Sequence, residues 1–129
     1  MKMLRLGIAS YEQMKARTLE IARGNYKPAA DEPKVWFRSA ESFARVLSDR
    51  NRALLGIIAE SAPESLARLA ELTGRKKSNL SRTLKTMERY GFVKLSRGAR
   101  GSLIPRVPYE RISLTLALSK PAREGTEAA

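Results

Sequence analysis

The most informative stretch of the sequence is residues 75–93, RKKSNLSRTLKTMERYGFV. Apolar residues recur in it at the i, i+4, i+7 spacing of one helix face, namely Leu80, Leu84 and Met87. This spacing predicts an α-helix over residues 78–90. Gly91 follows, and the apolar period then changes to two, which is typical of a strand. The stretch therefore predicts a two-faced helix that leads directly into a β-strand.

The segments on either side predict more helices and a hairpin. Helical patterns precede the stretch at residues 64–73 and 39–60, and the sequence leaves open whether the latter is one bent helix or two. Residues 92–95 and 103–107 read as strands that flank a basic, glycine-rich loop. Helix, glycine-containing turn, helix and two-stranded ribbon is the order of a winged helix-turn-helix.

Both ends of the chain add to this unit. Residues 3–8 alternate as in a strand, Ser10 is a candidate cap for a helix to about residue 23, and residues 112–118 form the clearest amphipathic strand. We therefore expect an α+β fold, a winged helix-turn-helix with an additional N-terminal strand and helix and a C-terminal strand. The expected division is an N-terminal extension and linker at 1–33, a candidate dimerisation element, then a DNA-binding domain at 34–119 and a disordered tail at 120–129.

Charge is concentrated in one part of the chain. The net charge is +12, and the segment from Arg75 to Arg111 holds eleven Lys or Arg residues against two acids, a net of +9. Because these cations are interleaved with periodic apolar residues, the segment should fold and present its charge on a surface. A folded basic surface is the footprint expected for a polyanion partner, most often nucleic acid.

The residue types that are absent restrict the chemistry. The chain has no cysteine and no histidine, so thiolate nucleophiles, histidine proton shuttles and the commonest metal ligands are excluded. We therefore expect no enzyme activity, no metal site and no cofactor. Charged residues interrupt every apolar run and the N-terminus is a poor signal peptide, which predicts a cytoplasmic protein that does not enter the membrane.

The polar face of the helix at 78–90 suits a DNA major groove. When the helix is drawn at about 100° per residue, Ser78, Arg82, Lys85 and Arg89 lie opposite the apolar stripe. Arginine can pair with guanine, asparagine with adenine, and lysine with phosphate. A merely solvated face is the alternative, and the adjoining basic hairpin favours nucleic acid.

Residues 75–93 resemble the recognition helix and strand entry of ArsR/MarR-like winged-helix regulators, whose pattern is S-x-V-S-R-x-L-x-x-L-x-x-x-G-L-V. More widely, the segment from Lys34 to Ile112 resembles a family of small prokaryotic predicted transcriptional regulators. The resemblance implies DNA contacts on the recognition helix by Lys76, Lys77, Ser78, Asn79, Ser81, Arg82, Lys85 and Arg89. It also implies wing contacts by Arg97 and Arg100. Metal sensing, which uses cysteine and histidine ligands in ArsR-type proteins, is not implied.

The partners that follow are double-stranded DNA, a second copy of the chain and, by analogy, a toxin protein. Members of the family are suspected antitoxins, so repression of the chain's own or a neighbouring operon is the expected function. The alternative is a structured-RNA or ribosome-binding module that reads backbone shape with the same basic face. Trp36 and Phe37 are expected in a core, although a ligand pocket is the other interpretation, and Tyr90 and Phe92 are expected to pack under the wing.

Overall fold

The computed structural model describes residues 2–118, which form five α-helices and five β-strands. This content confirms the mixed α+β class. The chain divides into two compact units. The first contains residues 2–4 and 44–111, and the second contains residues 5–43 and 112–118. No helix in the described part of the chain is long and apolar enough to cross a membrane.

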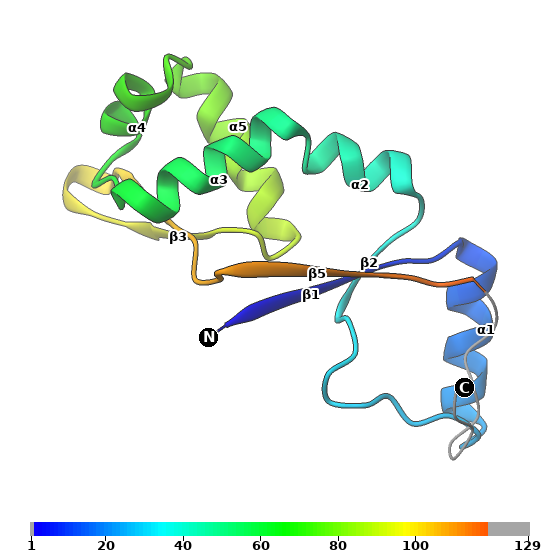
Figure 1. Ribbon diagram of the computed structural model, residues 1–129. Helices are drawn as coiled ribbons and strands as arrows, with labels where there is room; N and C mark the ends of the chain where they lie inside the picture. The colour runs from blue at the N-terminus through cyan, green and yellow to red at the C-terminus, as the bar shows by residue number, and fades with distance from the viewer. Residues whose placement is uncertain (1, 119–129) are drawn as a thin grey trace. The chain divides into compact units, whose positions relative to one another are not determined.

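The first unit has three successive helices followed by a hairpin (Figure 1). The helices are α3 (Asp49–Ser61), α4 (Leu66–Thr73) and α5 (Lys77–Arg89). The hairpin pairs β3 (Lys94–Arg97) antiparallel with β4 (Leu103–Arg106), and a 3₁₀ turn over Ala99–Gly101 joins them. This is the order of elements in a winged helix-turn-helix, with α5 in the position of the recognition helix and the hairpin in that of the wing.

The core of the first unit explains why these elements form. Helix α5 packs on α4 and β3, and α3 packs on α4 and β4. The apolar stripe of α5, Leu80, Leu84 and Met87, is fully buried. The other large buried side chains are Leu54, Leu55, Ile58, Leu69, Phe92, Val93 and Pro105. Burying one such leucine is worth about 1.5–3 kcal/mol, so the stripe fixes which face of α5 remains for solvent.

Serine caps set the helix boundaries upstream of α5. Ser48 Oγ accepts a hydrogen bond from the Asn51 amide at 3.2 Å, which starts α3 and separates it from α2 (Ala40–Val46). The segment at 39–60, which the sequence left as one helix or two, is therefore two helices. Ser65 Oγ accepts from the Arg68 amide at 3.1 Å and starts α4. Local side-chain bonds of this kind fix where a helix begins.

The second unit contains a three-stranded sheet in the order β2-β1-β5. Its strands are β1 (Met3–Ile8), β2 (Val35–Phe37) and β5 (Arg111–Leu116). Strands β1 and β2 are parallel, with Leu6 opposite Val35 and Ile8 opposite Phe37, and α1 (Tyr11–Ala22) connects them. Ser10 and Gln13 form a capping box at the start of α1, as the Ser10 cap predicted.

Trp36 packs directly on the backbone of β1. A Cβ added at Gly7 would lie 2.3 Å from Trp36 Cε3, so only glycine admits the ring there. The Arg17 guanidinium carbon lies 5.6 Å from the centroid of the Trp36 ring and 5.8 Å from that of Tyr26, and Arg17 forms an ion pair with Glu32 at 2.9 Å. Trp36 is half-buried, whereas its neighbour Phe37 is 3% exposed.

The compact units differ from the division at 1–33, 34–119 and 120–129 expected from the sequence. Residues 34–43 and 112–118 group with β1 because β2 and β5 are its hydrogen-bonded neighbours in the sheet. The first hairpin strand also begins later than expected, since β3 starts at Lys94 rather than at residue 92, whereas β4 starts at Leu103 as expected. The tail at 120–129 lies outside the described residues.

Candidate nucleic-acid interface

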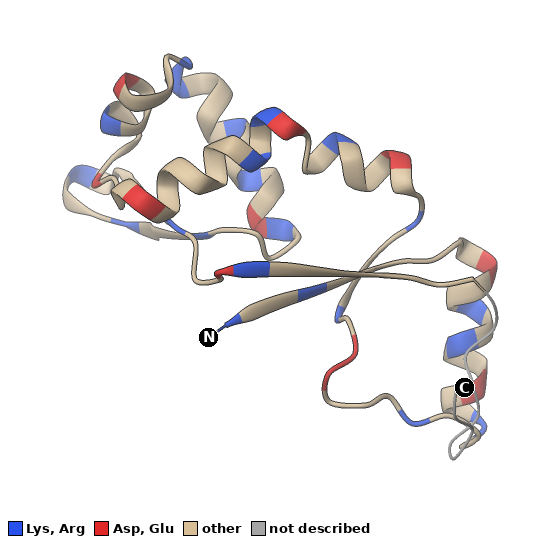
Figure 2. Cartoon of the chain, viewed as in Figure 1, with Lys and Arg blue, Asp and Glu red and all other residues tan. Residues whose placement is uncertain are grey.

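Helix α5 presents a polar, mostly basic face to solvent. Lys77, Ser78, Asn79, Arg82, Lys85 and Arg89 are exposed, Ser81 is half-buried, and the preceding Lys76 is exposed. Figure 2 shows the blue cations along α5 and the hairpin. The buried apolar stripe forces this orientation, because the two sets of residues occupy opposite sides of one helix. The structure thus brings the candidate residues of the recognition helix onto one surface.

The N-terminus of α5 differs from the N-termini of α1, α3 and α4. Lys76 is its N-cap residue and makes no side-chain capping bond, and the first turn holds no acidic residue. The first amides of a helix lack partners within the helix, and the helix dipole places partial positive charge there. This end of α5 therefore adds to the positive potential of the exposed face.

Glu88, the one acidic residue of α5, turns toward the hairpin. Its Oε2 accepts a hydrogen bond from the Leu95 amide at 3.2 Å. This bond ties the last turn of α5 to β3 and engages the carboxylate with the backbone. An acid here is compatible with an anionic partner because it lies to the side of the exposed face, at about 80° of helix rotation from Leu80.

A groove runs between α5 and the wing. Its volume is about 350 Å³, and α5 contributes Lys77, Ser81 and Lys85 to its lining. The hairpin contributes Arg97, Gly101, Ser102 and Leu103, and the start of α4 contributes Ser65, Leu66 and Ala67. Its lining holds three cations and no carboxylate, which suits a polyanion backbone.

The two wing arginines differ in their surroundings. Arg97 Nη1 donates to the Gly101 carbonyl at 2.9 Å, so the wing tip holds this guanidinium at the groove. Arg100 is exposed at the turn with φ of 58°, a left-handed conformation that is uncommon for residues other than glycine. Arg106, another hairpin cation, is structural, since its Nη1 donates to the Pro63 carbonyl at 2.8 Å.

A second groove of about 280 Å³ lies on the other side of α5. Arg82, Thr83, Thr86 and Met87 line it from α5, and Arg45, Val46 and Asn51 line it from α2 and α3. Arg82 thus separates from Lys77, Ser81 and Lys85, which line the groove at the wing. Residues of α5 therefore line two grooves, one on each side of the helix.

Arg75 and Asn51 are candidate site residues that sequence reasoning missed. Arg75 Nη2 donates to Asn51 Oδ1 at 3.1 Å, across 24 positions of sequence. Burial and, next, the positive charge of Arg50 lower the pKa of Arg75 from its usual value. Arg75 belongs to the basic block, so its charge was visible in the sequence. Nothing in the sequence indicated that Asn51 is its hydrogen-bond partner.

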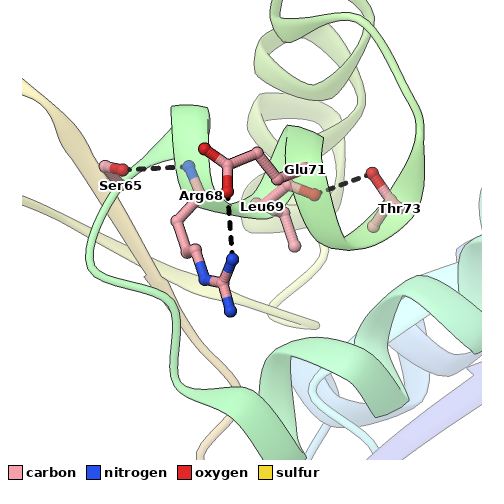
Figure 3. A network of polar contacts seen from close by, with 5 residues as sticks. All are labelled: Ser65, Arg68, Leu69, Glu71 and Thr73. Carbon is pink, nitrogen blue, oxygen red and sulfur yellow. Dashed lines mark hydrogen bonds and ion pairs between the residues drawn. The ribbon is translucent and has the colours of Figure 1, made fainter.

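Helix α4 is stabilised by polar contacts among its own residues (Figure 3). Besides the Ser65 cap, Thr73 Oγ1 donates to the Leu69 carbonyl at 2.8 Å at its last turn, and Arg68 pairs with Glu71 at 3.0 Å. Gly74 then turns the chain with φ of 73° toward α5. These contacts fix both ends of α4 and so define where the short turn to α5 begins.

The aromatic residues singled out in the sequence lie in both units. Phe92 is 1% exposed in the first unit, as expected of packing under the wing, and Tyr90 is half-buried. Trp36, expected in a core, instead lines a cavity of about 170 Å³ in the second unit, with Met14, Arg17, Tyr26 and others. The packing of the Trp36 ring on Gly7 is sufficient to explain its position, so the cavity does not require a ligand.

Comparison with known proteins gives one family and one solved structure. The family model named HVO_A0114 matches residues 46–114, which is 69 of the 129 residues. A crystal structure of a predicted DNA-binding transcriptional regulator from E. coli is 25% identical, with 55% of this chain and 75% of that chain covered and a TM-score of 0.45. A TM-score this low does not establish a common fold.

No curated protein matches the chain. The family match extends from the end of α2 through α3, α4, α5 and the hairpin into β5, and so includes the groove at the wing and all of the second groove except Arg45. The more specific resemblance to ArsR and MarR regulators stays a prediction from sequence. On the extent of the family match, the chain belongs to the HVO_A0114 family.

Proposed function

We propose that this protein is a sequence-specific regulator of transcription that binds double-stranded DNA. The observation that carries the proposal is the exposed face of α5, which is basic and polar, has no acid at its centre, and is fixed outward by a fully buried apolar stripe. A helix of this kind fits the major groove, which is about 12 Å wide. The exposed face of α5 is then the surface that meets the base edges.

The residues of α5 divide between two tasks in this proposal. Arg82 and Asn79 supply the side chains that form paired hydrogen bonds with guanine and adenine edges, and Ser78 and Ser81 can bond to either. Lys76, Lys77, Lys85 and Arg89 neutralise phosphates, as do Arg97 and Arg100 on the wing. Phosphate contacts position the helix and base contacts select the sequence.

The regulatory consequence is repression of the protein's own or a neighbouring operon, since a protein bound over a promoter excludes polymerase. A small toxin encoded beside it is the proposed protein partner, and a second copy of the chain is the proposed assembly. We propose binding rather than catalysis because cysteine and histidine are absent from the sequence. Selection and sequencing of bound fragments from the source genome would test the operon assignment. No enrichment of promoter fragments would contradict it.

The central experiment is a titration of the selected duplex at several salt concentrations. If about three of the six cations assigned to phosphates contact a phosphate in each chain, a dimer neutralises about six phosphates, and log K against log salt should have a slope near −5, at about −0.9 per phosphate. A flat response would remove the electrostatic basis of the proposal. A matched structured RNA should bind more weakly, and equal affinity for it would favour an RNA-binding module instead.

A further inference from the structure

The groove between α5 and the corner of α2 and α3 has the chemistry of an anion site. Of the seven residues that line it, Arg45 and Arg82 are cations, Asn51, Thr83 and Thr86 are neutral and polar, and none is acidic. It lies on the side of α5 away from Lys77, Ser81 and Lys85, which line the groove at the wing. The helix thus has cation-lined grooves on both sides.

Arg75 lies beside this groove rather than in its lining, hydrogen-bonded to Asn51, which does line it. The Asn51 amide nitrogen Nδ2 donates to the Val46 carbonyl at 3.0 Å, which fixes the side chain across the break between α2 and α3. Its Oδ1 is then turned to accept from Arg75 Nη2 at 3.1 Å. The Arg75 amide also donates to Thr73 Oγ1 at 3.2 Å. These bonds pre-set the position of a guanidinium two residues before α5 begins.

The cations around this corner lack carboxylate partners. The ion pairs formed within residues 2–118 use Arg17, Arg23, Arg52 and Arg68, and none uses Arg45, Arg50 or Arg75. The partner of the half-buried Arg75 is a neutral amide, and Arg50 is close enough for its charge to act on Arg75. Because arginine stays protonated, this repulsion persists in the free protein and a bound anion would relieve it.

A helix seated in the major groove has a phosphate backbone on each side of it. The wing-side groove can serve one strand, which leaves the second groove for the other. We propose that Arg45 and Arg75 hold a backbone phosphate of the bound DNA in the groove between α5 and the α2–α3 corner, with Asn51 as the positioning residue for Arg75. The inference rests on the proposed function, because it specifies a further contact with the same duplex.

The test compares salt slopes of charge variants on a cognate and a random duplex. Arg75→Gln and Arg45→Gln should each weaken binding about three- to tenfold and make the slope shallower by about one for each chain bound, equally on both duplexes. Arg75→Lys keeps the charge and should keep most of the slope. Arg23→Gln is the matched control, since Arg23 is exposed, paired with Glu20 and part of the other unit, and it should change nothing.

Asn51→Asp is the sharpest variant because it removes no cation. The new carboxylate would sit against Arg75 and neutralise it, so binding and slope should fall as for Arg75→Gln. Circular dichroism and thermal melting show whether each variant is folded. Unchanged slopes in folded Arg75→Gln and Asn51→Asp, beside a steep slope in the unaltered protein, would overturn this inference and leave the proposed function standing. A flat slope in the unaltered protein would overturn both.

Discussion

Arg82 and Arg97 provide the comparison that separates base reading from phosphate binding. Arg82 lies on α5 and is exposed, whereas Arg97 is held at the wing by the Gly101 carbonyl. Arg82→Ala should cost about 1–3 kcal/mol on the cognate duplex through loss of a paired base contact, and far less on random DNA. Titration of both duplexes measures the difference.

Arg97→Ala, by contrast, should weaken binding to both duplexes alike and make the salt slope shallower by about one unit for each chain bound. Arg100→Ala should behave in the same way, because Arg100 is exposed at the tip of the same wing. If Arg82→Ala also reduces the two affinities equally, α5 is only an electrostatic cradle and sequence-specific regulation is the wrong function.

Gly7 and Gly56 form a pair of glycines with opposite expected effects. A Cβ at Gly7 would overlap Trp36, whereas one at Gly56, inside α3, would meet nothing within 4 Å. Gly7→Ala should therefore lose about 1–3 kcal/mol of stability by overpacking, and Gly56→Ala should gain up to about 1 kcal/mol. Thermal melts followed by tryptophan emission measure this, since Trp36 is the only tryptophan. An unchanged melting temperature for Gly7→Ala would show that the Trp36 ring can move to admit the added Cβ.

Single residues were predictable where the signal was local. The exposure of Arg82 and Lys85 follows from their angle to Leu80 and Leu84, and these four positions need no information from elsewhere in the chain. The bond from Arg75 to Asn51 depends on how the helices pack, and no spacing in the sequence encodes it. The exposed face of α5 was thus predictable from the sequence, whereas the contact between Arg75 and Asn51 was not.

Helix α4 offers a test of capping against surface ion pairing. Ser65→Ala removes the acceptor for the Arg68 amide and should cost about 1 kcal/mol. Arg68→Ala removes an exposed ion pair with Glu71 and should cost only a few tenths of a kcal/mol, because water screens such pairs.

Urea unfolding monitored by circular dichroism compares the two α4 variants. The order of the two losses is the decisive result, and a larger loss for Arg68→Ala would contradict the capping argument. Ser65 also lines the wing groove, so DNA affinity is measured separately from stability.

Among the secondary-structure elements, the helices and the hairpin were predictable from the sequence, and the three-stranded sheet was predictable only in part. Residues 39–60 form two helices because Ser48 and Asn51 close the start of α3, a bond the pattern permitted but did not require. The strands at residues 3–8 and 112–118 were both expected from the sequence, and the sheet places β5 beside β1 in the same chain. The parallel pairing of β1 with β2 through α1 was not predicted, because nothing in the three residues of β2 indicates the strand with which it pairs or the direction of pairing.

The assembly of the protein can be tested at β5. This is an edge strand of the sheet formed by the described residues, and it exposes leucine side chains at alternate positions: Leu114 is 45% exposed and Leu116 is 58% exposed. An exposed apolar edge favours pairing with a second copy. In the proposed dimer, Leu114→Lys with Leu116→Lys should give a monomer by light scattering, with weaker binding to an inverted-repeat duplex.

Half-sites about 34–36 Å apart are expected for such a dimer, roughly one turn of DNA. Replacing exposed Leu72, which lies in the other unit, by Lys is the control and should leave the mass unchanged. A double variant that remains a dimer would exclude β5 as the interface.

The order of segments along the chain has an evolutionary consequence. Residues 44–111 form one continuous stretch of the first unit, set between residues 5–43 and the residues from 112 onward, which belong to the second. In the gene, the groove-bearing part is therefore a single cassette within the coding sequence of the sheet-bearing part. Recombination at two points can exchange that cassette whole, so a lineage can acquire new groove residues while it inherits the surrounding sheet unaltered.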